Sequence, residues 1–321
     1  MTESARLDAF NSSGESRLRS ASRCRVGIGH ALVDNCSSKE ACEAIITHAK
    51  NCGSPAFVIT PNAQHIVILA KDRRLRKIYD RADLVVPDGA SLLMAARLYG
   101  RSLQERVTGV DLFQALCKMA ARERLKVFLL GGRPSSAQRT EELLKRRFPE
   151  LQVDTYCPPF HFEQSTEGLQ KVNETIRAAC PDILFVALGA PKQEYWIHEH
   201  GLKLSVPVCI GVGGTFEIVC GIVPRAPAWI QSLSCEWLYR LCREPRRMWR
   251  RYLIGNIEFS IIVLSQLIRR FFLELLLWLA AKGSFAAELS ELSAPCEEGI
   301  LRDLAAAASR NVGKSPDSLT A

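Results

Sequence analysis

Short apolar runs alternate with longer amphipathic stretches through the middle of the chain. The runs are bounded by turn-forming residues, so we expect them to be strands, at residues 57–60, 84–87, 126–131, 153–156, 183–189 and 207–213. In the stretches between them apolar residues return every three or four positions, which predicts helices over residues 38–51, 63–82, 110–124, 135–148 and 168–179. This alternation is typical of an α/β fold, and we predict a mostly parallel, Rossmann-like sheet flanked by helices.

The composition of the chain changes near both ends. Residues 1–24 are rich in serine and arginine and hold no apolar stretch, so we expect a disordered leader and not a signal peptide. Residues 25–234 carry the alternating pattern without an internal repeat and predict a single catalytic domain. Residues 235–282 predict a helical appendage that is first arginine-rich and then apolar, and residues 283–321 predict a disordered tail.

The net charge of +8 is concentrated at the start of the appendage. Six arginines lie there, at positions 240, 243, 246, 247, 250 and 251, which favours an anionic partner. The apolar part, residues 259–281, is interrupted by Arg269, Arg270 and Glu274, and its longest charge-free piece is much shorter than the roughly 20 residues of a membrane-spanning helix. We therefore expect the appendage to lie on an anionic membrane surface, with a buried core helix or a homo-oligomer contact as the alternative.

Several classes of protein are disfavoured by missing signatures. The arginine run is not accompanied by aromatic residues interleaved on a sheet, and an apolar stretch follows it directly, so we expect no nucleic-acid partner. The 12 cysteines are scattered without a Cys-x-x-Cys pair, which favours a reducing cytoplasm. The histidines show no metal-ligand spacing, and neither a P-loop nor a complete dinucleotide fingerprint is present. An Asp-x-Asp pair is also missing, so we expect chemistry without a metal or a cofactor.

Polar groups follow three of the predicted strands. Asp88 follows the run 84–87, Thr60 and Asn62 end the run 57–60, and a glycine-rich bend covers residues 211–217. Because the carboxyl ends of parallel strands meet at one edge of a sheet, these groups predict one pocket for a polar, phosphorylated substrate. Taken alone, Asp88 is more typical of an Asp-Gly turn that ends a strand, and Asn62 is as typical of a helix cap as of a site residue.

The chain resembles the WecG/TagA/CpsF glycosyltransferases over residues 26–252. The matching blocks are residues 60–62 (TPN), 87–89 (PDG), 106–111 (RVTGVD), 131–132 (GG), 189–194 (GAPKQE), 211–217 (GVGGTFE) and 236–240 (EWLYR). The resemblance implies transfer of a hexose, commonly of the N-acetylmannosamine type, from a UDP-sugar to a polyprenyl-diphosphate-linked sugar. It further implies inversion at the anomeric carbon, independence of metal, and action at the cytoplasmic face of the membrane.

The resemblance also assigns roles to single residues. It makes Asp88 the general base that takes a proton from the acceptor hydroxyl. Thr60, Asn62 and Gln193 match positions that line the site of the family, and Arg106 matches an arginine suited to the diphosphate. The neighbouring Lys192 would contact phosphate or be an exposed lysine, and Asp111 would meet the nucleotide or cap the next helix. We expect the exposed lysine and the helix cap.

The remaining candidate residues each have a structural alternative. Gly131 and Gly132 would admit the nucleotide close to the backbone or form a tight turn. Gly213 and Gly214 would open a helix whose amide groups hold the leaving diphosphate, or would serve close strand-to-helix packing. For the arginines of the appendage the alternatives are contact with UDP, as part of a closing element, or a role at the membrane surface alone; they are Arg240, Arg247 and Arg250.

The sequence thus predicts a glycosyltransferase of cell-surface polysaccharide synthesis, bound peripherally to the inner face of the plasma membrane. An alternative is a catalytically silent module that binds a nucleotide sugar within a membrane assembly complex. Replacement of Asp88 by asparagine separates the two, because only the enzyme would lose turnover.

Overall fold

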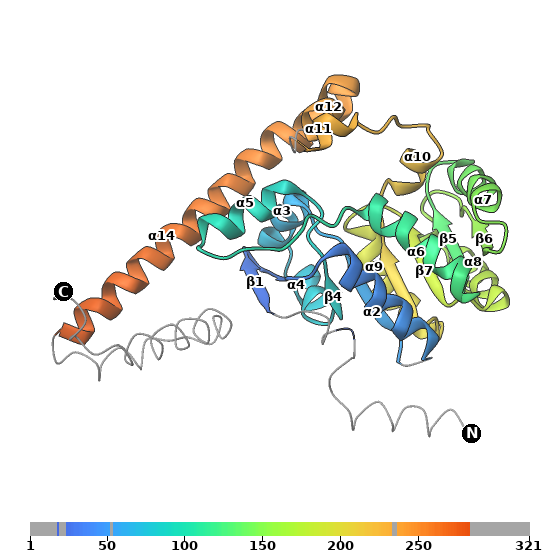
Figure 1. Cartoon of the computed structure of the whole chain (residues 1–321), viewed down its shortest axis with the longest axis horizontal. Helices are drawn as coiled ribbons and strands as arrows, with labels where there is room; N and C mark the ends of the chain where they lie inside the picture. Colours follow the sequence, from blue (N-terminus) through green and yellow to red (C-terminus); the bar gives the residue numbers. More distant parts are fainter. Residues whose placement is uncertain (1–17, 19–23, 52–53, 233–235, 283–321) are drawn as a thin grey trace. The chain divides into compact units, whose positions relative to one another are not determined.

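The computed structural model describes Leu18 and residues 24–51, 54–232 and 236–282 of the chain. Within these residues a six-stranded sheet forms the centre of the fold (Figure 1). Its strand order is β4-β3-β8-β7-β5-β6. The strands are β3 (Ala56–Ile59), β4 (Leu84–Val85), β5 (Lys126–Gly131), β6 (Gln152–Tyr156), β7 (Ile183–Ala187) and β8 (Val208–Gly211). Every neighbouring pair in this sheet is parallel, so the predicted strands and their direction are confirmed.

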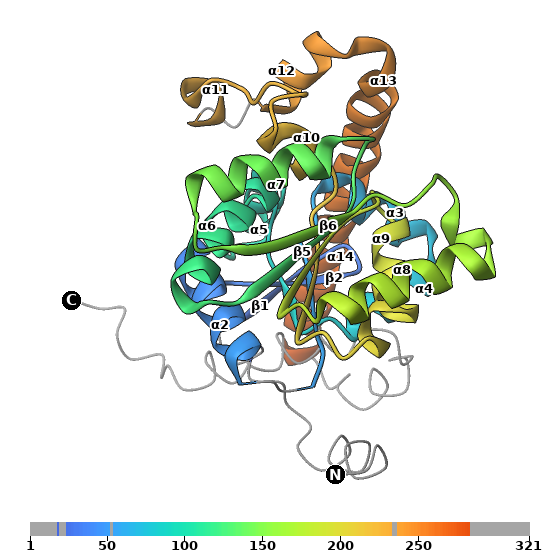
Figure 2. The ribbon, with the colours of Figure 1, turned by 90° about the vertical axis from the view of Figure 1, so that its right-hand side faces the viewer.

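The helices cover both faces of the sheet. Figure 2 shows α2, α6 and α7 on one face and α8 and α9 on the other. Every residue of β7 and β8 is buried, because helices shield these strands from both sides. This explains why the central strands read as continuous apolar runs and not as an alternation of apolar and polar residues.

Four of the predicted helices are present with nearly the expected ends. They are α2 (Ser38–Lys50), α6 (Gly109–Glu123), α7 (Ser136–Arg147) and α8 (Thr166–Ala179). The fifth, predicted over residues 63–82, is wrong as a single helix, because it consists of α3 (Ala63–Lys71) and α4 (Arg73–Asp80). Asp72 separates them: its carboxylate accepts hydrogen bonds from the N–H groups of Arg74 and Leu75 and so begins a new helix.

Several elements were not predicted. A separate antiparallel hairpin consists of β1 (Arg25–Ile28) and β2 (Ala31–Asp34). It is held to the sheet by the buried carboxylate of Asp34, which binds Arg25 at 2.7 Å and accepts from Val85 N–H at 2.7 Å. The additional short helices of this part of the chain are α5 (Ala90–Leu98), η2 (Phe162–Gln164), α9 (Lys192–Glu199) and η3 (Gly201–Lys203). The helix expected after the glycine-rich bend is α10 (Thr215–Val219).

The appendage is helical where the structure describes it. It comprises α12 (Glu236–Arg243), α13 (Pro245–Trp249), η4 (Arg250–Ile254) and α14 (Gly255–Lys282), and the short helix α11 (Ala228–Ser232) precedes it. The chain divides into two compact units, residues 1–263 and 264–321, so α14 begins in the first and continues in the second. None of the described helices has the length and apolar composition that a membrane crossing requires.

The two parts of α14 differ in their surroundings. In the first unit Phe259 and Val263 are buried, and the Tyr99 hydroxyl donates to the Val263 carbonyl at 3.3 Å. In the second unit large apolar side chains are exposed, among them Ile268, Phe271 and Trp278. The expected leader, apart from Leu18 and Cys24, and the expected tail lie outside the described residues.

Candidate active site

Three polar side chains converge at the start of α6. Asp88 follows β4, Thr60 follows β3, and Thr215 begins α10 after β8. A Cβ atom added at Gly109 would lie 3.6 Å from Asp88 Oδ2, 3.6 Å from Thr60 Oγ1 and 3.5 Å from Thr215 Oγ1. The structure therefore brings two of the predicted site residues together at the carboxyl edge of the sheet, where open α/β folds bind their ligands.

Asp88 is fixed by the backbone around it and is electrostatically perturbed. Its N–H donates to the carbonyl of Pro61 at 2.8 Å. Burial raises the pKa of its carboxyl to about 6, although a backbone hydrogen bond from Gly109 and the positive charge of Arg240 lower the pKa and the charge of Glu236 raises it. A carboxylate with this pKa is ionised at neutral pH and is more basic than an exposed aspartate, which suits a general base.

The two polar residues after β3 both contact the backbone. The buried Thr60 donates its hydroxyl hydrogen to the Gly211 carbonyl at 3.0 Å and so joins the ends of β3 and β8. Asn62 caps α3, because its side-chain oxygen accepts from Gln64 N–H at 3.0 Å. Asn62 therefore has the capping role that the sequence left open as its structural alternative. The cap uses the oxygen of its carboxamide.

The glycine-rich bend is held in place by Gln193. Gly213 N–H donates to Gln193 Oε1 at 3.0 Å. A Cβ at Gly211 would lie only 2.7 Å from Gln193 Nε2, whereas a Cβ at Gly213 would point into open space. Gly214 is exposed before α10, a helix of only five residues. Gln193 is 2% exposed, and both ends of its amide form hydrogen bonds, because Nε2 donates to Glu194. The neighbouring Lys192 binds Glu163 on the surface, as expected for an exposed lysine.

The Gly131-Gly132 pair forms a tight turn after β5. Both residues have positive φ, 91° and 83°, and Gly132 N–H donates to the Ala187 carbonyl at 2.8 Å. A Cβ at Gly131 would lie 2.8 Å from the same carbonyl oxygen, so only glycine fits there. Of the two expected roles the tight turn is therefore present, and the group that lies close to the Gly131 backbone is the end of β7.

The four arginines that were predicted to contact the substrate lie in different surroundings. Arg106 is half-buried, and the next residue, Val107, donates its N–H to the Pro87 carbonyl at 2.9 Å, directly before Asp88. Arg240 binds Glu236 at 3.4 Å on α12. Arg250 is exposed, with its guanidinium 5.3 Å from the ring centre of Trp249. The side chain of Arg247 lies outside the described part of the structure.

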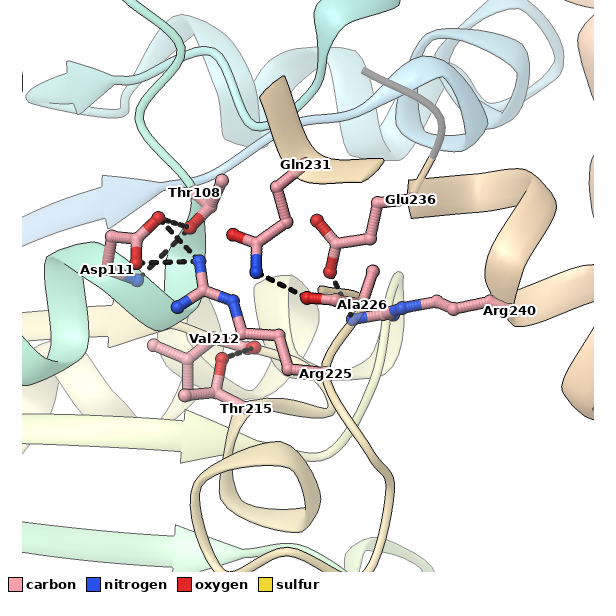
Figure 3. Close-up of polar contacts among 9 residues, drawn as sticks. All are labelled: Thr108, Asp111, Val212, Thr215, Arg225, Ala226, Gln231, Glu236 and Arg240. Atoms are coloured by element: carbon pink, nitrogen blue, oxygen red, sulfur yellow. Dashed lines mark hydrogen bonds and ion pairs between the residues drawn. The ribbon is translucent and has the colours of Figure 1, made fainter. Parts of the chain in front are cut away.

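Sequence reasoning missed an ion pair between the start of α6 and the segment that follows α10. Arg225 Nη2 donates to both carboxylate oxygens of Asp111 at 2.7 Å (Figure 3). The expected cap is corrected, because Thr108 caps α6 by accepting from Asp111 N–H at 3.1 Å and donating to its carboxylate at 2.6 Å. The spacing Thr108-x-x-Asp111 indicates this cap, whereas no sequence signal marks Arg225.

Two buried charged or titratable residues were also missed. Glu194 is fully buried, and His65 is 6% exposed. Glu194 was visible only as a member of a matching block, and the histidines were given no role because they lack metal-ligand spacing. Among the described residues, no three histidine, cysteine or acidic side chains are grouped so that they could hold a metal ion. Independence of metal stays a prediction.

Comparison with known proteins identifies the family. The model of the glycosyl transferase WecG/TagA/CpsF family matches residues 26–272. An N-acetylglucosaminyldiphosphoundecaprenol N-acetyl-beta-D-mannosaminyltransferase of Bacillus spizizenii is 35% identical over 198 residues, 62% of this chain and 75% of the relative. A protein of the same name from Bacillus subtilis is 32% identical over 211 residues, 66% of this chain and 80% of the relative. The chain belongs to the WecG/TagA/CpsF family of glycosyltransferases.

Proposed function

We propose that the protein transfers a hexose of the N-acetylmannosamine type from a UDP-sugar to a polyprenyl-diphosphate-linked sugar, with Asp88 as the general base. The observation that carries this proposal is the convergence of the Asp88 carboxylate with the hydroxyls of Thr60 and Thr215 around Gly109. The names of the two relatives support the choice of donor sugar and acceptor class. The product would be a lipid-linked intermediate in the synthesis of a cell-surface polysaccharide.

The proposed reaction is a single displacement at the anomeric carbon of the donor. The acceptor hydroxyl oxygen forms a bond to this carbon, and its proton moves to a carboxylate oxygen of Asp88. The bond between the anomeric carbon and the diphosphate breaks at the same time, and its electron pair leaves with UDP. Attack from the face opposite the diphosphate inverts the configuration of the sugar. The pKa of about 6 supports this role, since the base must be ionised before the reaction.

The leaving diphosphate requires positive charge, which we assign to Arg106 and Arg240 without a metal. The backbone contact between Val107 and Pro87 supports a position of Arg106 close to Asp88. Arg240 acts on the same site, because its charge lowers the pKa of the Asp88 carboxyl. Arg247 and Arg250 are assigned to the same segment, which would close over UDP when the acceptor is bound. The hydroxyl of Thr60 and the amide of Asn62 would orient the sugar, whereas Gln193, whose amide is engaged at both ends, would hold the glycine-rich bend in place.

The acceptor places this reaction at a lipid surface, and we propose peripheral binding to the inner face of the plasma membrane. The basic residues of α12 and α13 would contact anionic head groups, and the exposed apolar side chains of α14 would enter the head-group region. Sedimentation with vesicles tests this part. We expect binding to vesicles that contain anionic lipid and weaker binding to neutral vesicles or at high salt; equal binding to both would contradict it.

A transfer assay tests the function as a whole. The purified protein is incubated with a panel of UDP-sugars and a short-chain polyprenyl-diphosphate N-acetylglucosamine, with and without a chelator, and the product is weighed by mass spectrometry. We expect an added mass of one N-acetylhexosamine, with UDP-N-acetylmannosamine preferred and the chelator without effect. Binding of a UDP-sugar without transfer under any condition would favour the catalytically silent module.

A further inference from the structure

A buried polar chain runs from α3 to the first turn of α9 and contacts two segments of the candidate active site. Its members are His65, Gln193 and Glu194, whose exposed fractions are 6%, 2% and 0%. His65 Nε2 lies 3.6 Å from Glu194 Oε1, and neither His65 Nε2 nor Glu194 Oε2 has a hydrogen-bond partner among the described residues. Because a buried carboxylate with incomplete pairing is unfavourable for folding, packing alone does not account for Glu194.

The histidine end of this chain holds the loop between β3 and α3. Asn62 N–H donates to His65 Nδ1 at 3.2 Å, and Asn62 Oδ1 lies 3.1 Å from the same nitrogen. In the same loop the Pro61 carbonyl accepts from Asp88 N–H at 2.8 Å. A displacement of His65 would therefore move Asn62 and the backbone of Asp88 together.

The glutamate end of the chain holds the glycine-rich bend. Gln193 Nε2 donates to Glu194 Oε1 at 2.8 Å, which fixes the direction of the Gln193 amide. Its other end, Oε1, accepts from Gly213 N–H at 3.0 Å. The Gly211 carbonyl at the start of the bend accepts from the Thr60 hydroxyl at 3.0 Å, so the bend is tied to the end of β3 as well.

We infer that Glu194 is a positioning residue of the transfer reaction, which acts through His65 on the Asn62 loop and through Gln193 on the glycine-rich bend. This inference rests on the proposed function. The Asn62 loop follows β3 and the glycine-rich bend follows β8, the neighbouring strand, while Asp88 follows β4 on the other side of β3. One buried carboxylate therefore sets the spacing between the base and the groups that hold the donor. A misplacement of about 1 Å at such a site costs up to roughly 100-fold in rate.

The test is the Glu194→Gln variant in the transfer assay. Glutamine keeps the size of the side chain and an acceptor oxygen for Gln193, but it removes the charge that faces His65. We expect kcat to fall by about tenfold or more, because the reacting groups are misplaced, while KM for the UDP-sugar changes by less than about threefold. A structural role alone would lower the unfolding midpoint and leave kcat per folded molecule unchanged.

The His65→Gln variant and the double variant test whether the effect passes through the buried chain. We expect His65→Gln to lower kcat as well, and the double variant to be no slower than the slower single variant, because the two residues act on one path. Circular dichroism identifies a variant that does not fold; if Glu194→Gln does not, the kcat of His65→Gln decides. Equal kcat in the folded single variants and wild type, or fully additive losses, would overturn the inference.

Glu199→Gln is the matched control, because Glu199 lies on the same helix and forms an exposed ion pair with Arg74. We expect its kcat and KM to equal those of the wild type. Failure of the inference is distinguishable from failure of the proposed function. If the wild type transfers no sugar, the proposed function fails. If the wild type transfers the sugar and Glu194→Gln does so at the same rate, only the positioning role is contradicted.

Discussion

The raised pKa of Asp88 has a consequence for stability that is measurable without substrate. The carboxyl has a pKa of about 6 in the fold, against an ordinary value of 3.8. Above pH 6 it is ionised in both the folded and the unfolded state, and the folded state carries the cost of keeping the charge away from water. Below pH 4 it is neutral in both states. The wild type therefore loses stability through Asp88 as the pH rises from about 4 to about 6.

The Asp88→Asn variant removes this cost. The pKa difference corresponds to about 3 kcal/mol at about 1.4 kcal/mol per pH unit, which is an upper value because Asp88 is only part-buried. Asparagine keeps an oxygen that can accept the hydrogen bond from Gly109 and has no charge. We therefore expect the variant to be more stable than the wild type by up to about 3 kcal/mol at pH 8, with the difference falling to roughly 0.5 kcal/mol at pH 4.

Urea unfolding of both proteins at pH 8 and at pH 4 to 5, followed by circular dichroism, measures this difference. Asp111→Asn is the control, because Asp111 is 47% exposed and pairs with Arg225, so its replacement should slightly lower the stability at pH 8. An Asp88→Asn variant that is no more stable than the wild type at pH 8 would show that the Asp88 charge is not costly in the fold. An advantage of the same size at both pH values would do so as well, since burial of charge would not be its cause.

Three further predictions concern the rate, the turn after β5 and the surface ion pair. The kcat of the wild type should fall as the pH drops below about 6, because Asp88 takes up a proton; a flat profile between pH 5 and 8 would contradict this role. Gly131→Ala should lower the free energy of unfolding by roughly 2–4 kcal/mol in urea, since its Cβ would lie 2.8 Å from the Ala187 carbonyl; an unchanged midpoint would refute the contact. A double-mutant cycle of Asp111 and Arg225 should give a coupling energy of about 0.2–1 kcal/mol, as for other exposed pairs, and a value above about 2 kcal/mol would show that the pair is shielded.

The sheet could be predicted from the sequence because its strands are buried on both faces. Strands of this kind leave continuous apolar runs, as in β7 and β8. The break between α3 and α4 at Asp72 was not predicted, because the helical spacing of apolar residues continues across it. Only the side-chain hydrogen bonds of Asp72 show that a new helix begins. The hairpin of β1 and β2 was not predicted because its strands lack a continuous apolar run: buried and half-buried residues alternate in β1, and β2 ends in an aspartate.

The site residues that could be predicted are those that directly follow a strand. Asp88 and Thr60 follow β4 and β3, and parallel strands carry such residues to one edge. Residues whose roles depend on contacts between distant segments were not predictable: Arg225 meets Asp111, and Glu194 meets His65, without any local pattern that pairs them. The same holds for Gly109, which matters because it leaves the space that three side chains approach.

The most direct test of the central claim is the transfer rate of Asp88→Asn, measured together with its affinity for the UDP-sugar. If Asp88 takes the proton of the acceptor hydroxyl, the variant loses about 100- to 10,000-fold in kcat. Its dissociation constant for the donor, measured by calorimetry, stays within about threefold of the wild type, because the fold and the groups that hold the donor are retained. A variant that binds the donor and transfers the sugar at the rate of the wild type would contradict the account.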